Sequence, residues 1–253
     1  ESIGGLTGVA GALVAEDANL IFTSNRGEDT VGILAAENPG HVRKVGVGQR
    51  PNGLSFDPGR RTLLAANVGD PANPESHTLS IVDVDRAVLR GSIRVPGRTR
   101  WTVFDPTTDA FFVNIADPPS IVRIDGADPT AIAATIAIAA AGPHGLEVDE
   151  LGRLYCACDA GRLYVLAPPD YDIVADLPLA GAPDVIFLDP SLRQLYVAIG
   201  DPGVIEVFDV DRLERVQAVA TERGAHTIGL DPDRHRIYAF LPETHRAAVF
   251  AAS

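Results

Sequence analysis

The sequence of 253 residues predicts an all-β, six-bladed β-propeller of four-stranded antiparallel blades. The first observation is an internal repeat: six near-copies of one pattern fill the chain. The position that ends the first strand of each copy recurs after 42, 48, 44, 40 and 42 residues. The second observation is that each copy consists of short runs with β-type alternation. A period of about 40–45 residues made of such runs is typical of a propeller blade.

The fullest copy runs from Pro143 to Asp149 as Pro-His-Gly-Leu-Glu-Val-Asp and continues in the apolar run 154–158. Related first strands begin near Val9, Pro51, Arg100, Pro183 and His226. Asp-Pro pairs follow at 57–58, 105–106, 189–190 and 231–232. They predict the turn into the second strand, because Asp bonds nearby backbone and Pro fixes φ.

Third strands are expected at 78–83, 121–125, 163–166 and 204–209. Asp-Val-Asp-Arg at 83–86 and 209–212 predicts turns into the fourth strand, since it lacks the spacing of a calcium loop. The last copy ends with a third strand at 246–250, whereas residues 1–6 resemble the segment that precedes the second copy. We therefore expect the N-terminal segment to supply the outer strand of the last blade and to close one domain over residues 1–253.

Composition limits the partners of this acidic protein. A formal net charge of −13 and a pI near 4.8 argue against nucleic-acid binding. No run of about 18 apolar residues exists, so no membrane span is expected. Cys156 and Cys158 are the two cysteines, which is too few for a disulfide framework. We expect a monomer. The chain begins at Glu1, which fits either a removed export signal or a trimmed chain.

The pattern Pro-x-Gly-Leu/Val, then Asp-Pro, then Leu-Tyr-Val/Ala resembles the YVTN-repeat β-propellers, a family that includes the YncE-like proteins. The resemblance covers the whole chain, although no copy contains Tyr-Val-Thr-Asn intact; the nearest are 64–67 and 196–199. It implies a propeller and a periplasmic or secreted location, with a cytoplasmic one as the alternative. It does not specify a function, because one propeller fold serves many.

One register of the repeat is the strongest indication of a site. Propeller geometry places the starts of the first strands around one mouth of the axial channel. At this register the six copies carry Ala10, Asn52, Arg100, His144, Asp184 and His226. Small or turn-forming residues would be expected in every copy if the position were only structural. Five polar residues of differing type therefore indicate a binding site.

His144, Asp184 and His226 could hold a divalent transition metal, zinc first, with one coordination position left for water. Arg100 could grip an anionic small molecule in bidentate fashion. Asn52 and Trp101 would add a polar contact and an apolar wall. The alternatives are a ligand site without metal and a hydrogen-bonded plug of the channel.

Further candidates are expected on the face of the propeller that carries this channel mouth. His77 ends the long connection 68–77 between the second and third strands of the second copy, and His245 lies in the same connection of the sixth copy. Each could contribute to the site or could be a solvated loop residue. Glu147 could be a base near the channel or a charge paired with an arginine of a neighbouring blade. Cys158 could be a metal ligand or nucleophile, or a small core residue.

Two functions fit these residues. The first is a metal-dependent lyase or lactone hydrolase, with Arg100 as substrate clamp and Glu147 or His245 as proton-transfer group. The second is a non-catalytic binding or interaction scaffold with no metal. The sequence contains no phosphate-binding glycine loop, Gly-x-Ser-x-Gly elbow or His-Glu-x-x-His motif that would select a reaction.

Overall fold

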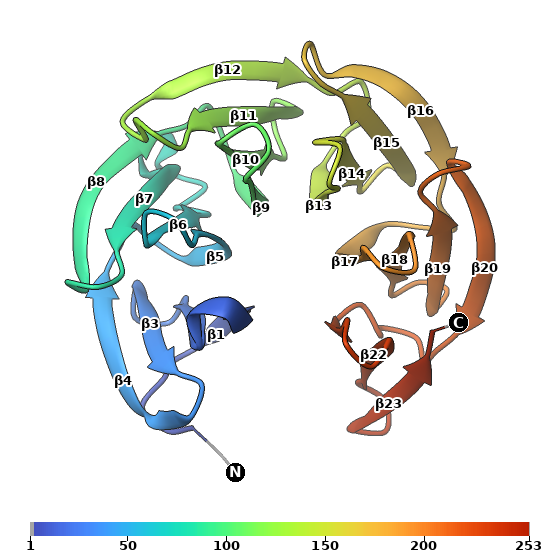
Figure 1. Cartoon of the computed structure of the whole chain (residues 1–253), viewed down its shortest axis with the longest axis horizontal. Helices are drawn as coiled ribbons and strands as arrows, with labels where there is room; N and C mark the ends of the chain where they lie inside the picture. The colour runs from blue at the N-terminus through green and yellow to red at the C-terminus, as the bar shows by residue number, and fades with distance from the viewer. Residues whose placement is uncertain (1–2, 253) are drawn as a thin grey trace. The chain divides into compact units, whose positions relative to one another are not determined.

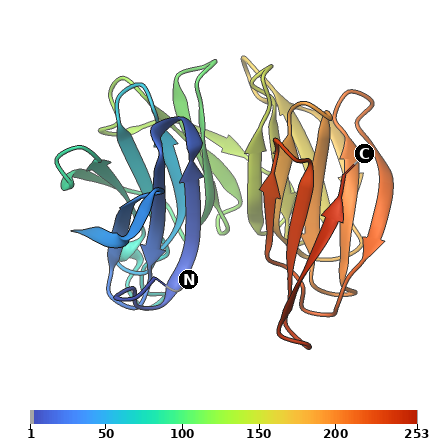
Figure 2. The ribbon, with the colours of Figure 1, turned by 60° about the horizontal axis from the view of Figure 1, so that its bottom comes forward.

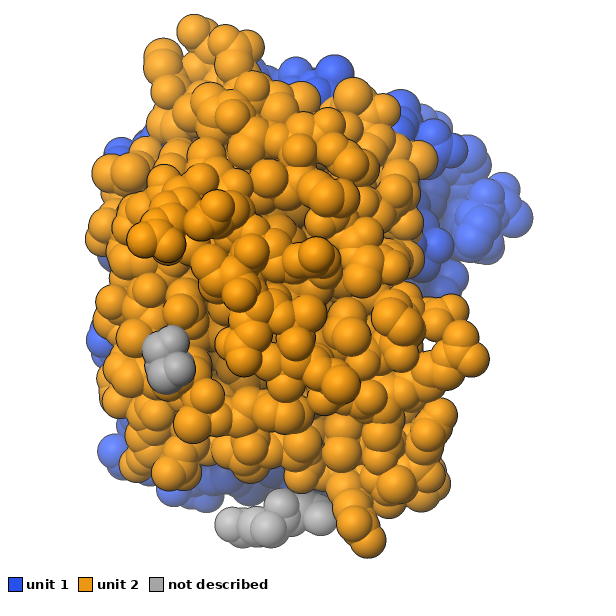
Figure 3. All heavy atoms as spheres, turned by 90° about the vertical axis from the view of Figure 1, so that its right-hand side faces the viewer, with its two compact units in different colours: residues 1–137 blue, residues 138–253 orange. Residues whose placement is uncertain are grey.

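The computed structural model of this protein describes residues 3–252 and is almost entirely β-strand. Two short 3-10 helices occur, η1 (Glu16–Ala18) and η2 (Pro74–Ser76), and no helix in the described part could cross a membrane. The strands form six antiparallel sheets, the blades of the predicted propeller. The chain divides into two compact units, residues 1–137 and 138–253, which Figure 3 colours separately. The prediction of one domain over residues 1–253 stays a prediction.

Unit 1 contains three four-stranded sheets. The first consists of β1 (Val9–Ala15), β2 (Leu20–Asn25), β3 (Thr30–Ala35) and β4 (Asn38–Gly46). The second consists of β5 (Pro51–Asp57), β6 (Thr62–Asn67), β7 (Thr78–Asp83) and β8 (Val88–Arg94). The third consists of β9 (Thr99–Asp105), β10 (Ala110–Ile115), β11 (Ser120–Asp125) and β12 (Ile132–Ala137). Each strand pairs only with its neighbours in sequence, as in a propeller blade.

Unit 2 contains two four-stranded sheets and one three-stranded sheet. The fourth sheet consists of β13 (Pro143–Val148), β14 (Leu154–Cys158), β15 (Arg162–Ala167) and β16 (Asp172–Pro178). The fifth consists of β17 (Pro183–Asp189), β18 (Gln194–Ile199), β19 (Val204–Asp209) and β20 (Glu214–Ala220). The sixth consists of β21 (Ile228–Asp231), β22 (Arg236–Leu241) and β23 (Arg246–Ala251).

Within unit 2, β13 and β17 lie on one side, and β16 and β20 lie on the opposite side (Figure 1). Its strands run roughly along one direction, so the strand ends gather at two edges of the unit (Figure 2). Residues at the starts of the first strands are thereby brought to the same edge.

The second strand of most sheets is buried on both faces. Phe111 and Phe112 are neighbours in β10, and both are completely buried. Successive side chains of a strand point to opposite faces, so both faces of this sheet are covered. Phe111 packs on Phe104 of the adjacent strand with ring centroids 4.7 Å apart. Apolar burial between stacked sheets therefore forms the core, which explains the continuous apolar runs in the sequence.

The aspartates that end the first strands form the predicted turns. Their Oδ1 atoms accept backbone N–H hydrogen bonds from two residues further on, at 2.9 Å for Asp57, 2.9 Å for Asp105, 3.0 Å for Asp149 and 3.0 Å for Asp189. All four residues are buried. The prediction that Asp bonds its own backbone is confirmed for the Asp-Pro turns at Asp57, Asp105 and Asp189; in the fourth such turn Asp231 accepts from the N–H of Arg234, three residues on, at 3.0 Å. For the buried aspartates this bonding satisfies carboxylates that burial would otherwise destabilise.

The sixth sheet differs from the predicted four strands, since β23 is its last strand in the described residues. Of the segment 1–6 that was expected to complete it, Glu1 and Ser2 lie outside the described residues, and residues 3–8 form no strand. The carbonyl groups of Thr7 and Gly8 accept hydrogen bonds within unit 1, from the N–H groups of Gly27 (3.1 Å) and Arg26 (2.9 Å). Closure by the N-terminal segment stays a prediction.

Candidate functional site

The first strands of unit 2 are irregular where the polar register lies. The pairing of β13 with β14 shifts register between Pro143 and Gly145, and that of β17 with β18 shifts between Pro183 and Ile186. His144 and Asp184 lie inside these irregularities. Bulges redirect side chains and are frequent beside functional sites. Both side chains remain partly exposed, at 14% and 30%.

Gly145 explains why β13 and β17 converge at this point. A Cβ atom on Gly145 would lie 2.8 Å from the carbonyl oxygen of Asp184 and 2.9 Å from Cγ2 of Ile186. Only glycine permits such an approach of one backbone to another. The absence of a side chain directly after His144 therefore allows His144 to lie beside Asp184 of the next sheet.

Four side chains of unit 2 form a hydrogen-bonded chain, which we call the Asp–His array: Asp159, His144, Asp184 and His226. Nδ1 of His144 lies 2.7 Å from Oδ1 of Asp159, and its Nε2 lies 3.1 Å from Oδ1 of Asp184. Oδ2 of Asp184 lies 2.5 Å from Nδ1 of His226. The array joins three successive sheets, because His144 is in β13, Asp184 is in β17 and His226 lies two residues before β21.

The two carboxylates determine where the array carries protons. Both nitrogens of His144 face carboxylate oxygens, so the ring satisfies both only when each nitrogen carries a hydrogen. Burial by itself raises the pKa of Asp184, but the hydrogen bonds and charges of His144 and His226 outweigh burial and hold that pKa below its usual value. Asp184 is therefore an ionised acceptor at neutral pH.

His226 presents the reactive atom of the array. Its Nδ1 donates to Asp184, which places the lone pair of the neutral ring on Nε2. Within residues 3–252, Nε2 has no hydrogen-bond partner, and the side chain is 52% exposed. An exposed imidazole oriented by a carboxylate can accept or donate a proton, as the histidine of a catalytic dyad does.

The predicted metal ligands meet, but they bond to one another. In the described residues no group of three or more His, Cys, Asp or Glu is arranged to hold a metal ion. His144 and Asp184 use on each other two of the atoms that a metal would need. The zinc site at His144, Asp184 and His226 stays a prediction, and it requires the contact between His144 and Asp184 to open.

The other candidates of unit 2 lie outside the array. Glu147 is three residues beyond His144 in β13, and no hydrogen bond or ion pair of the described residues joins it to the array. Burial raises the pKa of Glu147 to about 8, although a hydrogen bond with the backbone of Val148 lowers it slightly. His245 is exposed in the turn before β23, and Cys158 is completely buried, with its Sγ 3.9 Å from that of Cys156.

The remaining candidates belong to unit 1. Oδ1 of Asn52 accepts a hydrogen bond of 2.7 Å from Nη2 of Arg26. Arg100 and Trp101 are half-buried neighbours in β9. Nδ1 of His77 lies 2.6 Å from the carbonyl oxygen of Val68, so this side chain is held within its own loop. These four residues stay predicted ligand contacts.

The sequence interpretation missed Asp159. It follows Cys158 at the end of β14, and Cys158 pairs with Pro143, the residue before His144. A signal was therefore present: the turn after the second strand lies beside the start of the first strand. Cys158 is the candidate that the sequence predicts at this position, but the carboxylate of Asp159, one residue later, is the group that contacts His144.

Comparisons with known proteins support the fold. No family model matches the sequence, and no curated protein matches it. The solved structures of similar fold include one titled Kuenenia stuttgartiensis Hydrazine Synthase, with a TM-score of 0.65 and 17% identity over 100% of this chain and 97% of that chain. Another, titled Crystal Structure of Mitotic Checkpoint Complex, has a TM-score of 0.82 and 12% identity over 96% of this chain and 74% of that chain. The chain is a six-bladed β-propeller. Sequence identities this low are evidence for a shared fold but not for a shared function.

Proposed function

We propose that unit 2 of this propeller binds a small molecule at the Asp–His array and hydrolyses a lactone there, with Asp184 and His226 as the acid–base pair. One observation carries the proposal: Oδ2 of Asp184 lies 2.5 Å from Nδ1 of the half-exposed His226. This contact orients the ring and leaves Nε2 toward solvent. His144 is a positioning residue, because it holds the other oxygen of Asp184.

The reaction needs only groups that the array supplies. Nε2 of His226 takes a proton from water as the water oxygen bonds to the lactone carbonyl carbon. The carboxylate of Asp184 stabilises the imidazolium that forms. When the ring C–O bond breaks, the imidazolium returns the proton to the leaving alkoxide, and the product is a hydroxy acid. The hydrogen bond and charge of His144 help hold the pKa of Asp184 below its usual value, which keeps Asp184 ionised.

The test is hydrolysis of glucono-δ-lactone and δ-valerolactone, followed by proton release. We expect turnover above the uncatalysed rate and a loss of about 10²–10⁴-fold in His226→Gln. Asp184→Asn should lower kcat more than it changes KM. His235→Gln is the matched control, because His235 also bonds a carboxylate of unit 2, Oδ2 of Asp189 at 2.8 Å, outside the array. Equal rates in the protein and in His226→Gln would overturn the proposal.

A metal site is the second candidate, favoured by a specific observation. His144 and His226 both direct Nδ1 at a carboxylate, as metal-binding histidines do. Nε2 of His226 is left for an ion, whereas Nε2 of His144 would become available only if its contact with Asp184 opened. A metal held by His144, Asp184 and His226 would supply a Lewis acid and a more acidic water. Elemental analysis after dialysis against zinc should then give one equivalent in the parent and none in His144→Ala/His226→Ala. Equal content in both would exclude this site.

The family and the location are proposals of the same kind. The repeat pattern supports membership of the YVTN-repeat propellers, whose YncE-like members suggest a periplasmic or secreted protein. An anionic ligand at Arg100 of unit 1 is a separate proposal, which rests on the polar register of the repeat. If neither lactone turnover nor metal binding depends on the array, the chain is better described as a non-catalytic scaffold.

A further inference from the structure

The starts of the first strands in unit 1 converge as they do in unit 2. A Cβ atom on Gly53 of β5 would lie 2.5 Å from the carbonyl oxygen of Arg100 in β9, just as one on the corresponding glycine of β13 would lie 2.8 Å from that of Asp184. In unit 2 the residue before this glycine, His144, contacts Asp184. The same close approach of two strands brings the backbones of Asn52 and Arg100 together in unit 1.

Arg26 adds a second guanidinium group to this edge of unit 1. It directly follows β2, and its N–H donates to the carbonyl oxygen of Gly8, the residue before β1, at 2.9 Å. Asp159 has the equivalent place in the fourth sheet, where its N–H donates to the carbonyl oxygen of Gly142 at 2.8 Å. Nη2 of Arg26 donates a hydrogen bond of 2.7 Å to Oδ1 of Asn52. The turn after a second strand therefore supplies a side chain to the polar register in unit 1 as well.

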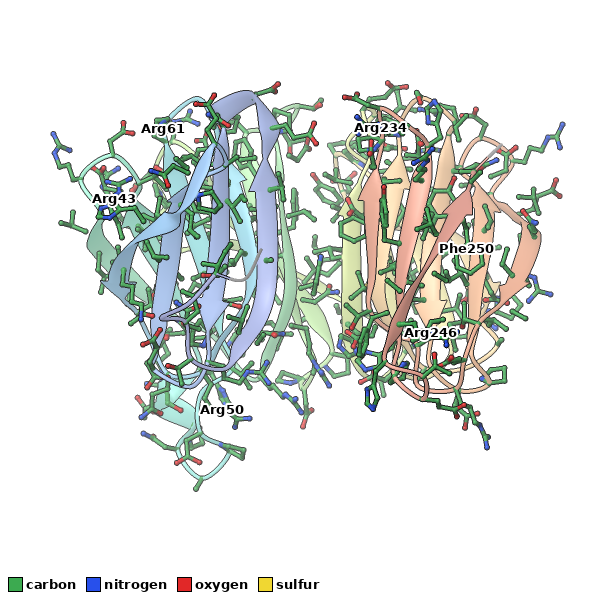
Figure 4. All side chains as sticks on the ribbon, turned by 90° about the horizontal axis from the view of Figure 1, so that it is seen from below. Arg43, Arg50, Arg61, Arg234, Arg246 and Phe250 are labelled. Carbon is green, nitrogen blue, oxygen red and sulfur yellow. The ribbon has the colours of Figure 1, made fainter. Side chains whose placement is uncertain are left out.

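The charge at these places is reversed between the two units. Unit 2 has the carboxylates of the Asp–His array there, whereas unit 1 has the guanidinium groups of Arg26 and Arg100. The register of unit 1 contains no carboxylate, since its residues are Ala10, Asn52 and Arg100. Figure 4 shows Arg50, which directly precedes β5, at this edge of unit 1, and Arg61, which directly precedes β6, at the opposite edge. The edge therefore presents positive charge beside its polar register.

Arg26 also fixes the orientation of the Asn52 amide. A guanidinium group can only donate hydrogen bonds, so the amide atom that faces it is the oxygen. The amide nitrogen of Asn52 is left as a donor, and no hydrogen bond from it occurs among residues 3–252. Arg26, Asn52 and Arg100 are each partly exposed. Three neighbouring side chains thus present N–H donors, two of them charged, where a small molecule can reach them.

We propose that unit 1 binds an oxyanion, the carboxylate or phosphate group of a small molecule, at this edge through Arg26, Asn52 and Arg100. A guanidinium group presents paired N–H donors that match two oxygens of such a group, and these charge-assisted hydrogen bonds are roughly twice as strong as neutral ones. The amide N–H of Asn52 adds an uncharged donor. This site extends the anionic ligand proposed at Arg100, on which it rests, and is independent of lactone hydrolysis at the Asp–His array.

The test uses Trp101, the only tryptophan of the sequence, which directly follows Arg100 in β9. The full chain is titrated with succinate and with inorganic phosphate at constant ionic strength, and binding is followed by tryptophan fluorescence and by calorimetry. We expect saturable binding of at least one anion, and the tighter one identifies the class. Arg26→Gln should weaken binding by about tenfold or more, because a charged donor is lost. Arg90→Gln, at an exposed arginine of the outer strand β8, is the matched control and should bind as the parent does.

Asn52→Asp separates binding from folding. The aspartate keeps an acceptor for Arg26 but replaces the N–H donor by a negative charge. Anion binding should therefore fall by about tenfold or more, while the midpoint of thermal unfolding stays equal or rises.

Two results would overturn the proposal. Absence of binding to the parent by both methods would remove this site together with the ligand at Arg100. Binding that Arg100→Gln weakens, but that Arg26→Gln and Asn52→Asp leave unchanged, would remove this site and keep the ligand at Arg100.

Discussion

Glu147→Gln should remove a pH-dependent cost from the folded chain. Burial raises the pKa of Glu147 from 4.5 to about 8. Well below pH 4.5 the carboxyl is protonated in both the folded and the unfolded chain, so it does not change the free energy of unfolding. As the pH rises toward 8, the unfolded chain ionises while the folded chain does not, so stability falls. At about 1.4 kcal/mol per pKa unit, the loss between pH 5 and pH 7 is at most about 2.5 kcal/mol. Because Glu147 is partly exposed, we expect about 1–2 kcal/mol.

The assay is urea unfolding at pH 5 and pH 7 for the parent and Glu147→Gln. The variant keeps the shape of the side chain but cannot ionise, so its stability should fall less between the two pH values. Glu214→Gln, at an exposed glutamate of the same unit, is the control and should behave as the parent. A carboxyl-carbon NMR titration should place the midpoint of Glu147 near pH 8. A midpoint near 4.5, or equal pH dependence in parent and variant, would refute the reasoning.

Three further predictions concern unit 2. Gly145→Ala should destabilise the folded chain by about 1–3 kcal/mol, because the new Cβ would lie 2.8 Å from the Asp184 carbonyl oxygen. Gly229→Ala is the control: a Cβ there would have nothing within 4 Å, so the loss measured by thermal unfolding should be less than about 1 kcal/mol. Asp184→Asn should cost about 1–2 kcal/mol at pH 7, and the difference should shrink only below pH 3.8, since the lowered pKa of Asp184 stabilises the fold above that pH. His235→Ala should raise the pKa of Asp189, because burial raises that pKa and the hydrogen bond of His235 opposes it; NMR titration of the carboxyl measures the change.

Residues that act through local patterns were predictable from the sequence. The buried Asp57, Asp105, Asp149 and Asp189 each accept hydrogen bonds from backbone two residues away, and that interaction depends only on local chain geometry. The alternation and spacing of the strands are local as well. The repeat added a longer-range inference: residues at one register of successive copies share one edge. His144, Asp184 and His226 meet for this reason.

What those side chains do once together depended on tertiary structure. Asp184 bridges two histidines because bulges at the starts of β13 and β17 and the missing side chain of Gly145 set the separation of two strands that lie 40 residues apart. Asp159 joins the array from a turn that the register did not include. The three-strand make-up of the sixth sheet within the described residues also emerged only from strand pairing. A repeated sequence determines which residues share an edge, whereas hydrogen-bond partners depend on ångström-scale strand separations that arise only when the sheets pack.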